Sequence, residues 1–194
     1  MIDKTKIENL TKDLILKYVK RGSAAKSFPK IITAEGIKIK EIEENNSFIG
    51  ALVKQPTNIF YIYLNKAIQN EGRKNFTLAH ELGHYFLKHY LQTGSVYCED
   101  NDINEEGEDN SAQEVEANYF ASFLLLPKEK LEKQFKQYKW NIDKNRIFNL
   151  VVTPKGNDYK NWKILSSKLT KYFKVSETAL RIRLINLGLL EWKC

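Results

Sequence analysis

The sequence predicts an α+β fold, in which a small, largely antiparallel sheet is followed by a helical portion. Two observations support this prediction. Three short segments between residues 36 and 64 are strand-like, and the first of them, GIKIKEIE, alternates apolar and charged residues. From about residue 73 onward, apolar residues recur instead every three or four positions, as they do on one face of a helix.

The elements expected before residue 70 are one helix, one helical turn and three strands. The first helix shows apolar residues at helical spacing: Ile7, Leu10, Leu14, Ile15, Tyr18 and Val19. It ends near Gly22, and a short helical turn follows between Pro29 and Gly36. The strands are expected over three ranges: 36–43, 48–53 and 59–64. A hairpin turn over residues 54–58 joins the last two strands.

The later part of the chain is expected to be mostly helical. Helices are predicted over five ranges: 73–90, 111–126, 128–139, 159–173 and 176–187. Pro127 stops the second of these helices. The acidic, asparagine-rich stretch 93–110 has no periodicity and is expected to be a mobile loop, and 142–156 is expected to be irregular.

Composition is that of an ordinary globular protein. The 194 residues are 42% hydrophobic and 28% charged, which suits one domain with a small appendage. Two cysteines, Cys98 and Cys194, predict no disulfide framework and therefore a reducing compartment. The N-terminus lacks the apolar core of a signal peptide, and no stretch approaches the ~20 apolar residues of a membrane span. A cytoplasmic protein without membrane contact is expected.

The net charge of +7 is unevenly distributed along the chain. Residues 99–109 form an acidic run, so the rest of the chain, and 128–174 in particular, is more basic. A basic surface can meet nucleic acid or an acidic protein. A solvated, lysine-rich surface is the favoured interpretation, because no arginine cluster or interleaved aromatic residues accompany the lysines.

The helix expected over 73–90 carries the pattern HExxH, in which His80 and His84 flank Glu81. Residues four apart lie on one helical face, so both imidazoles can reach one metal ion. Glu81 is turned about 100° from His80, so it can reach a metal-bound water without being a ligand. This arrangement predicts a zinc site in which Glu81 takes a proton from water. His89 is expected on the opposite face, exposed to solvent.

Zinc needs a third protein ligand, and the helix over 111–126 offers Glu114, Glu116 and Asn118. Glu114 shares one face with mostly apolar or small residues: Ala117, Asn118, Ala121, Leu124 and Leu125. A carboxylate on that buried face needs a strong partner, so Glu114 is the predicted ligand. Asn118, one turn later, is expected to accept the free ring N–H of His80. The alternative is that Glu114 only stabilises the helix N-terminus.

Three segments together resemble the ImmA/IrrE family of zinc peptidases. They are NFTLAHELGH over 75–84, EVEANYFASFLLLP over 114–127 and FKVSETALRIRLINLGLL over 173–190. The resemblance extends over most of the chain from about Pro29. It implies a gluzincin-like fold, with the small sheet packed on the two motif helices. It favours the same ligand set: His80, His84 and Glu114.

The resemblance also implies a biological role. Members of this family cleave or inactivate helix-turn-helix transcriptional repressors, and some are paired with such regulators as toxin and antitoxin. Some relatives show weak or no peptidase activity. The leading hypothesis is therefore a zinc endopeptidase acting on a transcriptional repressor. A zinc peptidase domain is expected over 1–140, with a helical subdomain over 141–194 packed on it.

A DNA-binding or regulator-binding protein with little proteolysis is the alternative function. The last two helices, with Ser176 as an N-cap, resemble a helix-turn-helix. Arg181 and Arg183 could then contact phosphates or bases. Packing of this segment on the peptidase domain is favoured, because its second helix has few residues that read base edges. For the peptidase, residues 59–63 are the candidate sheet edge that holds an extended substrate.

Overall fold

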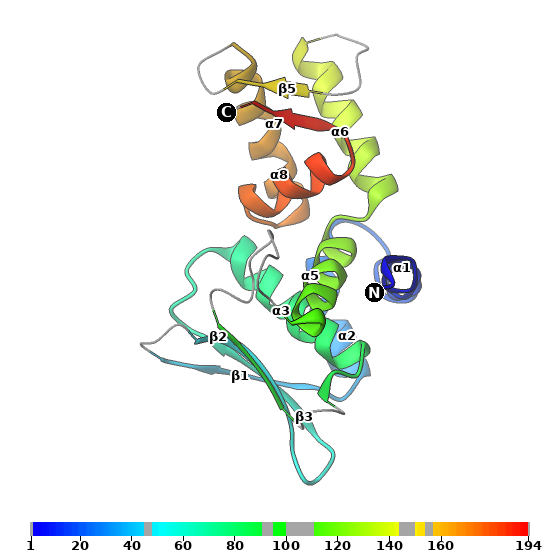
Figure 1. The fold of residues 1–194 in the computed structure, drawn as a ribbon, viewed down its shortest axis with the longest axis vertical. Coiled ribbons are helices and arrows are strands. Elements are labelled where there is room, and N and C mark those ends of the chain that lie inside the picture. The colour runs from blue at the N-terminus through cyan, green and yellow to red at the C-terminus, as the bar shows by residue number, and fades with distance from the viewer. Residues whose placement is uncertain are drawn as a thin grey trace.

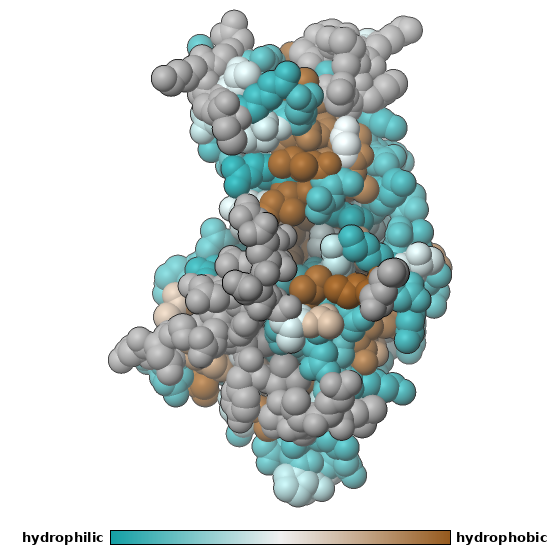
Figure 2. Space-filling model, viewed as in Figure 1, coloured by the Kyte–Doolittle hydropathy of each residue, from teal (hydrophilic) through white to brown (hydrophobic). Residues whose placement is uncertain are grey.

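The computed structural model describes residues 2–44, 48–90, 95–99, 111–143, 150–153 and 157–193. These residues form two lobes, one above the other in Figure 1. We call "lower lobe" the part built from the first three helices, the larger sheet and α5, and "upper lobe" the part built from the elements after Pro127. Figure 2 shows hydrophobic residues on one face where the two lobes meet.

The chain begins with helices that cover the lower lobe. Helix α1 (Lys4–Tyr18) starts where the Asp3 side chain accepts a hydrogen bond from the Lys6 N–H. A 3₁₀ turn, η1 (Ala24–Ser27), leads into α2 (Phe28–Ala34), which has a proline in its first turn and is followed by Gly36 at φ 67°. The helical turn expected between Pro29 and Gly36 is confirmed.

The larger sheet has the strand order β1-β3-β2-β4 among the described residues. Its strands are β1 (Lys38–Ile42), β2 (Phe48–Lys54), β3 (Phe60–Asn65) and β4 (Ser95–Glu99). Strand β2 pairs antiparallel with β3 and β4, whereas β1 pairs parallel with β3. The sheet is therefore largely antiparallel, as expected, and the α+β class is confirmed.

Two expectations about this sheet are wrong. Residues 59–63 are not an edge, because β3 pairs with β1 on one side and with β2 on the other. The edges of the described sheet are β1 and β4. Part of the segment 93–110 forms β4 rather than a loop, because its backbone pairs with β2. The acidic residues 100–109 and the cysteine at position 194 lie outside the described residues.

Helices α3 (Glu71–Phe86) and α5 (Ala112–Leu125) pack against each other in the lower lobe, and α3 also contacts the sheet (Figure 1). Gly83 of α3 allows this close approach, because a Cβ at that position would lie 3.1 Å from the Cα of Ala117. Leu52 and Ile62 from the sheet and Leu82 from α3 are completely or almost completely buried in the shared core. The motif helices and the sheet therefore form one packed unit.

The upper lobe contains α6 (Lys128–Asp143), β5 (Leu150–Val152), α7 (Asn157–Phe173), α8 (Glu177–Asn186) and β6 (Leu190–Trp192). Strands β5 and β6 form a short parallel pair, so the range 142–156, expected to be irregular, contains a strand over Leu150–Val152. Helix α6 is longer than expected and packs on α7, around the buried Phe135 and Trp162. The domain boundary at residue 140 stays a prediction. None of the described helices is long and apolar enough to cross a membrane.

Candidate metal centre

Helix α3 brings His80 and His84 together one turn apart. Asn70 caps this helix by accepting a hydrogen bond from the Arg73 N–H at 2.9 Å. Both imidazoles are completely buried, and their Nε2 atoms lie 2.9 Å apart. The two rings therefore direct the same nitrogen to the same point, as the spacing of the motif predicts.

Helix α5 adds the carboxylate of Glu114, which is only 9% exposed. The hydroxyl of Ser111 caps this helix and places Glu114 in its first turn. One carboxylate oxygen of Glu114 lies 3.0 Å from Nε2 of His80, and the other lies 3.4 Å from Nε2 of His84. The three ligand atoms are all within 4.8 Å of one another, so the group could hold a metal ion.

The hydrogen bonds behind the histidines show that this group suits a cation. Nδ1 of His80 lies 2.9 Å from Oδ1 of Asn118, the contact expected from the sequence. An amide oxygen only accepts, so Nδ1 carries the proton and Nε2 of a neutral His80 presents a lone pair. That lone pair faces the Glu114 carboxylate and Nε2 of His84. A cation between the three atoms satisfies all of them, whereas one proton satisfies a single pair.

The pKa values fit the same conclusion. Burial lowers the pKa of His84 to about 4, against the opposing effect of its hydrogen bond with Glu114. Burial alone would raise the pKa of Glu114, but hydrogen bonds with His80 and His84 outweigh it and lower that pKa to about 2. Burial also acts to lower the pKa of His80, but Glu114 and Glu81 together raise it. At neutral pH, His84 is therefore neutral and Glu114 is ionised, the states that bind a metal.

The side chain of Glu81 extends from α3 toward strand β2, and it is completely buried. Gly50 of β2 leaves the space for its carboxylate, because a Cβ at that position would be 2.6 Å from Oε1 of Glu81. Gly50 is not among the site residues predicted from the sequence. A glycine inside the apolar strand FIGALV is the signal that could have found it, because such glycines mark close approaches to a strand.

The expectation that His89 is exposed on the opposite face of a longer helix is wrong. Helix α3 ends at Phe86, and Lys88 adopts a left-handed conformation at φ 63° that turns the chain back. The N–H of His89 then donates to the carbonyl of His84 at 3.0 Å. His89 is 5% exposed, its Nδ1 lies 2.8 Å from Nδ1 of His84, and burial lowers its pKa.

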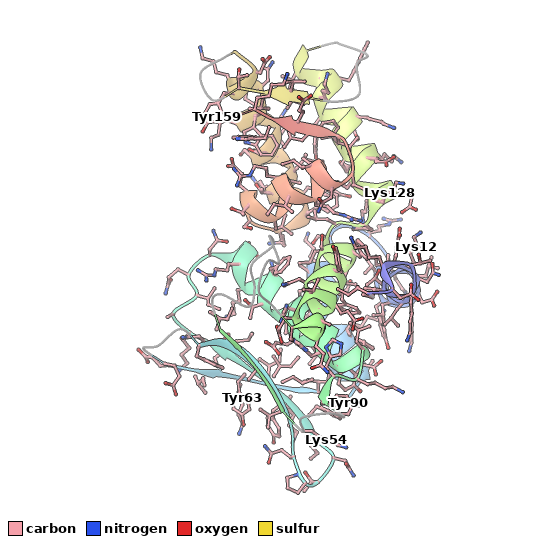
Figure 3. All side chains as sticks on the ribbon, viewed as in Figure 1. Lys12, Lys54, Tyr63, Tyr90, Lys128 and Tyr159 are labelled. Atoms are coloured by element: carbon pink, nitrogen blue, oxygen red, sulfur yellow. The ribbon has the colours of Figure 1, made fainter. Side chains whose placement is uncertain are left out.

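Glu116 contacts His89 rather than the group formed by His80, His84 and Glu114. Its Oε2 lies 3.2 Å from Nε2 of His89. Tyr90 follows His89 in the chain, and its ring centroid lies 4.7 Å from that of Phe60. The ammonium group of Lys54 lies over the ring of Tyr90 (Figure 3). These contacts hold the segment after α3 against the sheet. The only sequence signal for this arrangement is that all three histidines of the chain fall within ten residues.

The two arginines considered as nucleic-acid contacts lie in different surroundings. Ser176 caps α8, as expected, by accepting from the Ala179 N–H at 3.1 Å. Arg183 is 7% exposed, donates from Nε to the Leu126 carbonyl at 3.2 Å and packs over Phe123. It therefore joins α8 to the end of α5 and is not available to nucleic acid. Arg181 packs over the ring of Trp192 at 5.1 Å.

Comparisons with known proteins bear on the fold and on the family of this chain. A search of the curated proteins finds no match. Among solved structures, the chain is similar to a Mycobacterium tuberculosis transcriptional regulator, with a TM-score of 0.55 and 13% sequence identity. The match covers 93% of this chain and 46% of that protein, so the chain spans less than half of its length. The model of a peptidase family, Peptidase M78, described as the IrrE N-terminal-like domain, matches residues 36–185. With that match over most of its length, and with the ligand group inside the matched region, the chain belongs to the Peptidase M78 family of IrrE N-terminal-like domains.

Proposed function

We propose that this chain is a zinc-dependent endopeptidase that hydrolyses a peptide bond in a protein substrate. The observation that carries the proposal is the buried group of two imidazoles and one carboxylate. Glu81 lies beside this group on α3, the helix that carries both histidines. His80, His84 and Glu114 are the proposed ligands, and Asn118 orients His80. Glu81 is the proposed general base that accepts a proton from water.

The donor set favours zinc over the hard cations. Two imidazole nitrogens and one carboxylate are a known ligand set of catalytic zinc sites. Calcium and magnesium prefer ligand sets made of oxygen atoms alone. Bound zinc would polarise water and the substrate carbonyl. The chain's own contribution is to hold three ligand atoms in a buried cluster and to place a fourth side chain, Glu81, where it can accept a proton.

A helix-turn-helix transcriptional repressor is the proposed substrate. Support comes from the family resemblance and from the similarity to a protein described as a transcriptional regulator. An extended peptide could add to β4, which is an edge of the sheet among the described residues. This edge belongs to the side of the sheet near Glu81, because β4 pairs with β2, and β2 carries Gly50.

The metal is tested by elemental analysis. The purified protein should contain about one zinc per chain, because the described residues form one three-ligand group. His80→Ala and His84→Ala should each remove it. Well-folded wild-type protein that takes up no zinc would contradict the proposal.

Cleavage is tested by mapping new protein N-termini in cells that produce either the wild type or Glu81→Gln. The wild type should generate a new N-terminus inside a helix-turn-helix regulator. The variant should retain zinc but cleave about 10²–10⁴-fold more slowly, because the general base is lost. Equal cleavage by both proteins would exclude Glu81 as the base. Binding of the regulator without cleavage by either protein would instead support the regulator-binding alternative.

A further inference from the structure

His84 stands at one end of a chain of hydrogen-bonding side chains. Its Nδ1 lies 2.8 Å from Nδ1 of His89, and Nε2 of His89 lies 3.2 Å from Oε2 of Glu116. The three residues come from α3, from the turn after α3 and from α5. His84 and His89 are buried, whereas the Glu116 side chain is 31% exposed.

The chemistry of the three groups sets the direction of these hydrogen bonds. An ionised carboxylate only accepts, so Nε2 of His89 donates to Glu116. Nδ1 of a neutral His89 then carries a lone pair and accepts from Nδ1–H of His84. Consequently Nε2 of His84 keeps its own lone pair, and this is the atom that faces Glu114 and His80.

The backbone is shaped to make this contact. Lys88 adopts a left-handed conformation that is unfavourable for a residue with a side chain, and the turn closes with the His89 N–H on the His84 carbonyl. This turn brings the ring of His89 next to the ring of His84, on the side of Nδ1. His80 is held by an amide, Asn118, so each proposed ligand histidine has a separate partner on its outer nitrogen.

We propose that His89 and Glu116 are positioning residues that fix the ring orientation and the tautomer of His84 for metal binding. This inference rests on the proposed zinc site. Neither residue is a ligand, because the ring nitrogens of His89 face His84 and Glu116, and the ligand group found among the described residues contains neither. Glu116 acts on the metal only through His89.

Zinc affinity, measured by competition with a chromogenic chelator, is the first test. His89→Phe retains the ring volume but removes the acceptor, and should weaken zinc binding about 10–100-fold. His89→Gln offers an amide oxygen to Nδ1 of His84 and should recover part of the loss. Glu132→Gln is the matched control, because that carboxylate is 29% exposed and lies on α6 in the upper lobe. It should bind zinc as the wild type does.

A double-variant comparison distinguishes positioning from simple packing. Glu116→Ala should weaken zinc binding about 10-fold in the wild-type protein and have no further effect when combined with His89→Phe. Nitrogen NMR of the metal-free wild type should show the His84 proton on Nδ1, and His89→Phe should show a mixture of tautomers. If His89 and Glu116 served only the packing of the fold, the losses of zinc affinity in the two variants would be additive and the His84 tautomer would be unchanged.

The possible failures can be told apart. Wild-type protein that binds no zinc would overturn the proposed function and this inference together. Wild-type protein that binds zinc, with His89→Phe and Glu116→Ala binding equally tightly, would overturn the inference alone. If His89→Phe does not fold, unchanged zinc affinity in both Glu116→Ala and His89→Gln, together with an unchanged His84 tautomer, would overturn it.

Discussion

Glu114 and Glu116 lie two residues apart on α5, yet their side chains contact different histidines. Glu114 reaches His80 and His84, whereas Glu116 reaches His89. The step of about 100° per residue separates their directions by about 200° on the helix, and the returning turn after α3 brings His89 to the second one. One helix can therefore supply both a ligand and an outer partner to the same cluster.

Substitution of the two glutamates should separate these roles. Glu114→Ala should weaken zinc binding by more than about 100-fold, because a ligand contributes more than the 10–100-fold typical of outer partners. Glu116→Ala should cost about 10-fold. Zinc titration of both variants against a chelator measures the difference. A greater loss for Glu116→Ala than for Glu114→Ala would reverse the assignment.

Zinc affinity should depend on pH through one histidine rather than two. The pKa of His80 is raised, so this side chain holds a proton in mildly acidic solution that zinc must displace. His84, with a pKa of about 4, and Glu114, with a pKa of about 2, carry no competing proton above pH 5. Between pH 6 and 5, apparent affinity should fall about 10-fold per unit as pH falls. A 100-fold fall per unit, measured by titration at fixed ionic strength, would mean that both histidines compete.

At the scale of elements, the contact between α3 and α5 sets the spacing of the proposed ligands. Gly83→Ala would place a methyl group 3.1 Å from the Cα of Ala117 and 3.2 Å from the Cβ of Phe120. The nearest neighbour is backbone, so the helices should move apart, although alanine by itself favours a helix by up to about 1 kcal/mol. Zinc affinity of Gly83→Ala should fall. An unchanged affinity in the chelator assay would show that the helices absorb the methyl group without moving.

The sequence predicts the features that depend on residues close together in the chain. The HExxH spacing and the cap at Ser176 each depend on residues within about one turn, and the apolar face around Glu114 depends on residues of a single helix. All three have their counterparts in the structure. The central position of β3 depends on a parallel pairing with β1 that the hairpin turn does not reveal. Strand β4 depends on pairing with β2, almost fifty residues earlier in the chain.

His89 shows the same limit at a single residue. Helical periodicity continued to Tyr90 predicts an exposed side chain, but the helix ends four residues earlier. The reversal occurs at Lys88, and lysine carries none of the signal that glycine or asparagine gives at a left-handed position. The position at which the helix ends was therefore predicted wrongly, and a helix continued to Tyr90 does not bring His89 into contact with His84.

At the scale of the whole molecule, the upper lobe contacts the lower lobe through the ends of both motif helices. Gly72, in the first turn of α3, lies against the backbone of Val175 and Ser176. Asn75 of α3 donates to the Lys174 carbonyl at 2.9 Å. Arg183 of α8 donates to the Leu126 carbonyl at the end of α5. The lobes are thus joined by backbone approach and hydrogen bonds as well as by apolar packing.

Gly72→Ala should disturb this junction. The added Cβ would lie 2.3 Å from the carbonyl carbon of Val175, which no side-chain movement can relieve. We expect a loss of about 1–3 kcal/mol in the free energy of unfolding, typical of overpacking. Urea unfolding of zinc-loaded and metal-free protein measures it. Asn75→Ala, which removes only one hydrogen bond, should lose about 0.5–1.5 kcal/mol. A Gly72→Ala variant as stable as the wild type would contradict the close approach.

The shared helices make zinc binding and lobe docking thermodynamically reciprocal. Helices α3 and α5 carry the proposed ligands, and one end of each helix, the start of α3 and the end of α5, lies at the junction with the upper lobe. If separating the lobes weakens zinc binding by some factor, zinc must favour the docked lobes by that same factor. A protein that binds the α7–α8 turn would then change the affinity for a metal ion at His80, and the metal ion would change the affinity for that protein by the same factor. The two would not need to be in contact.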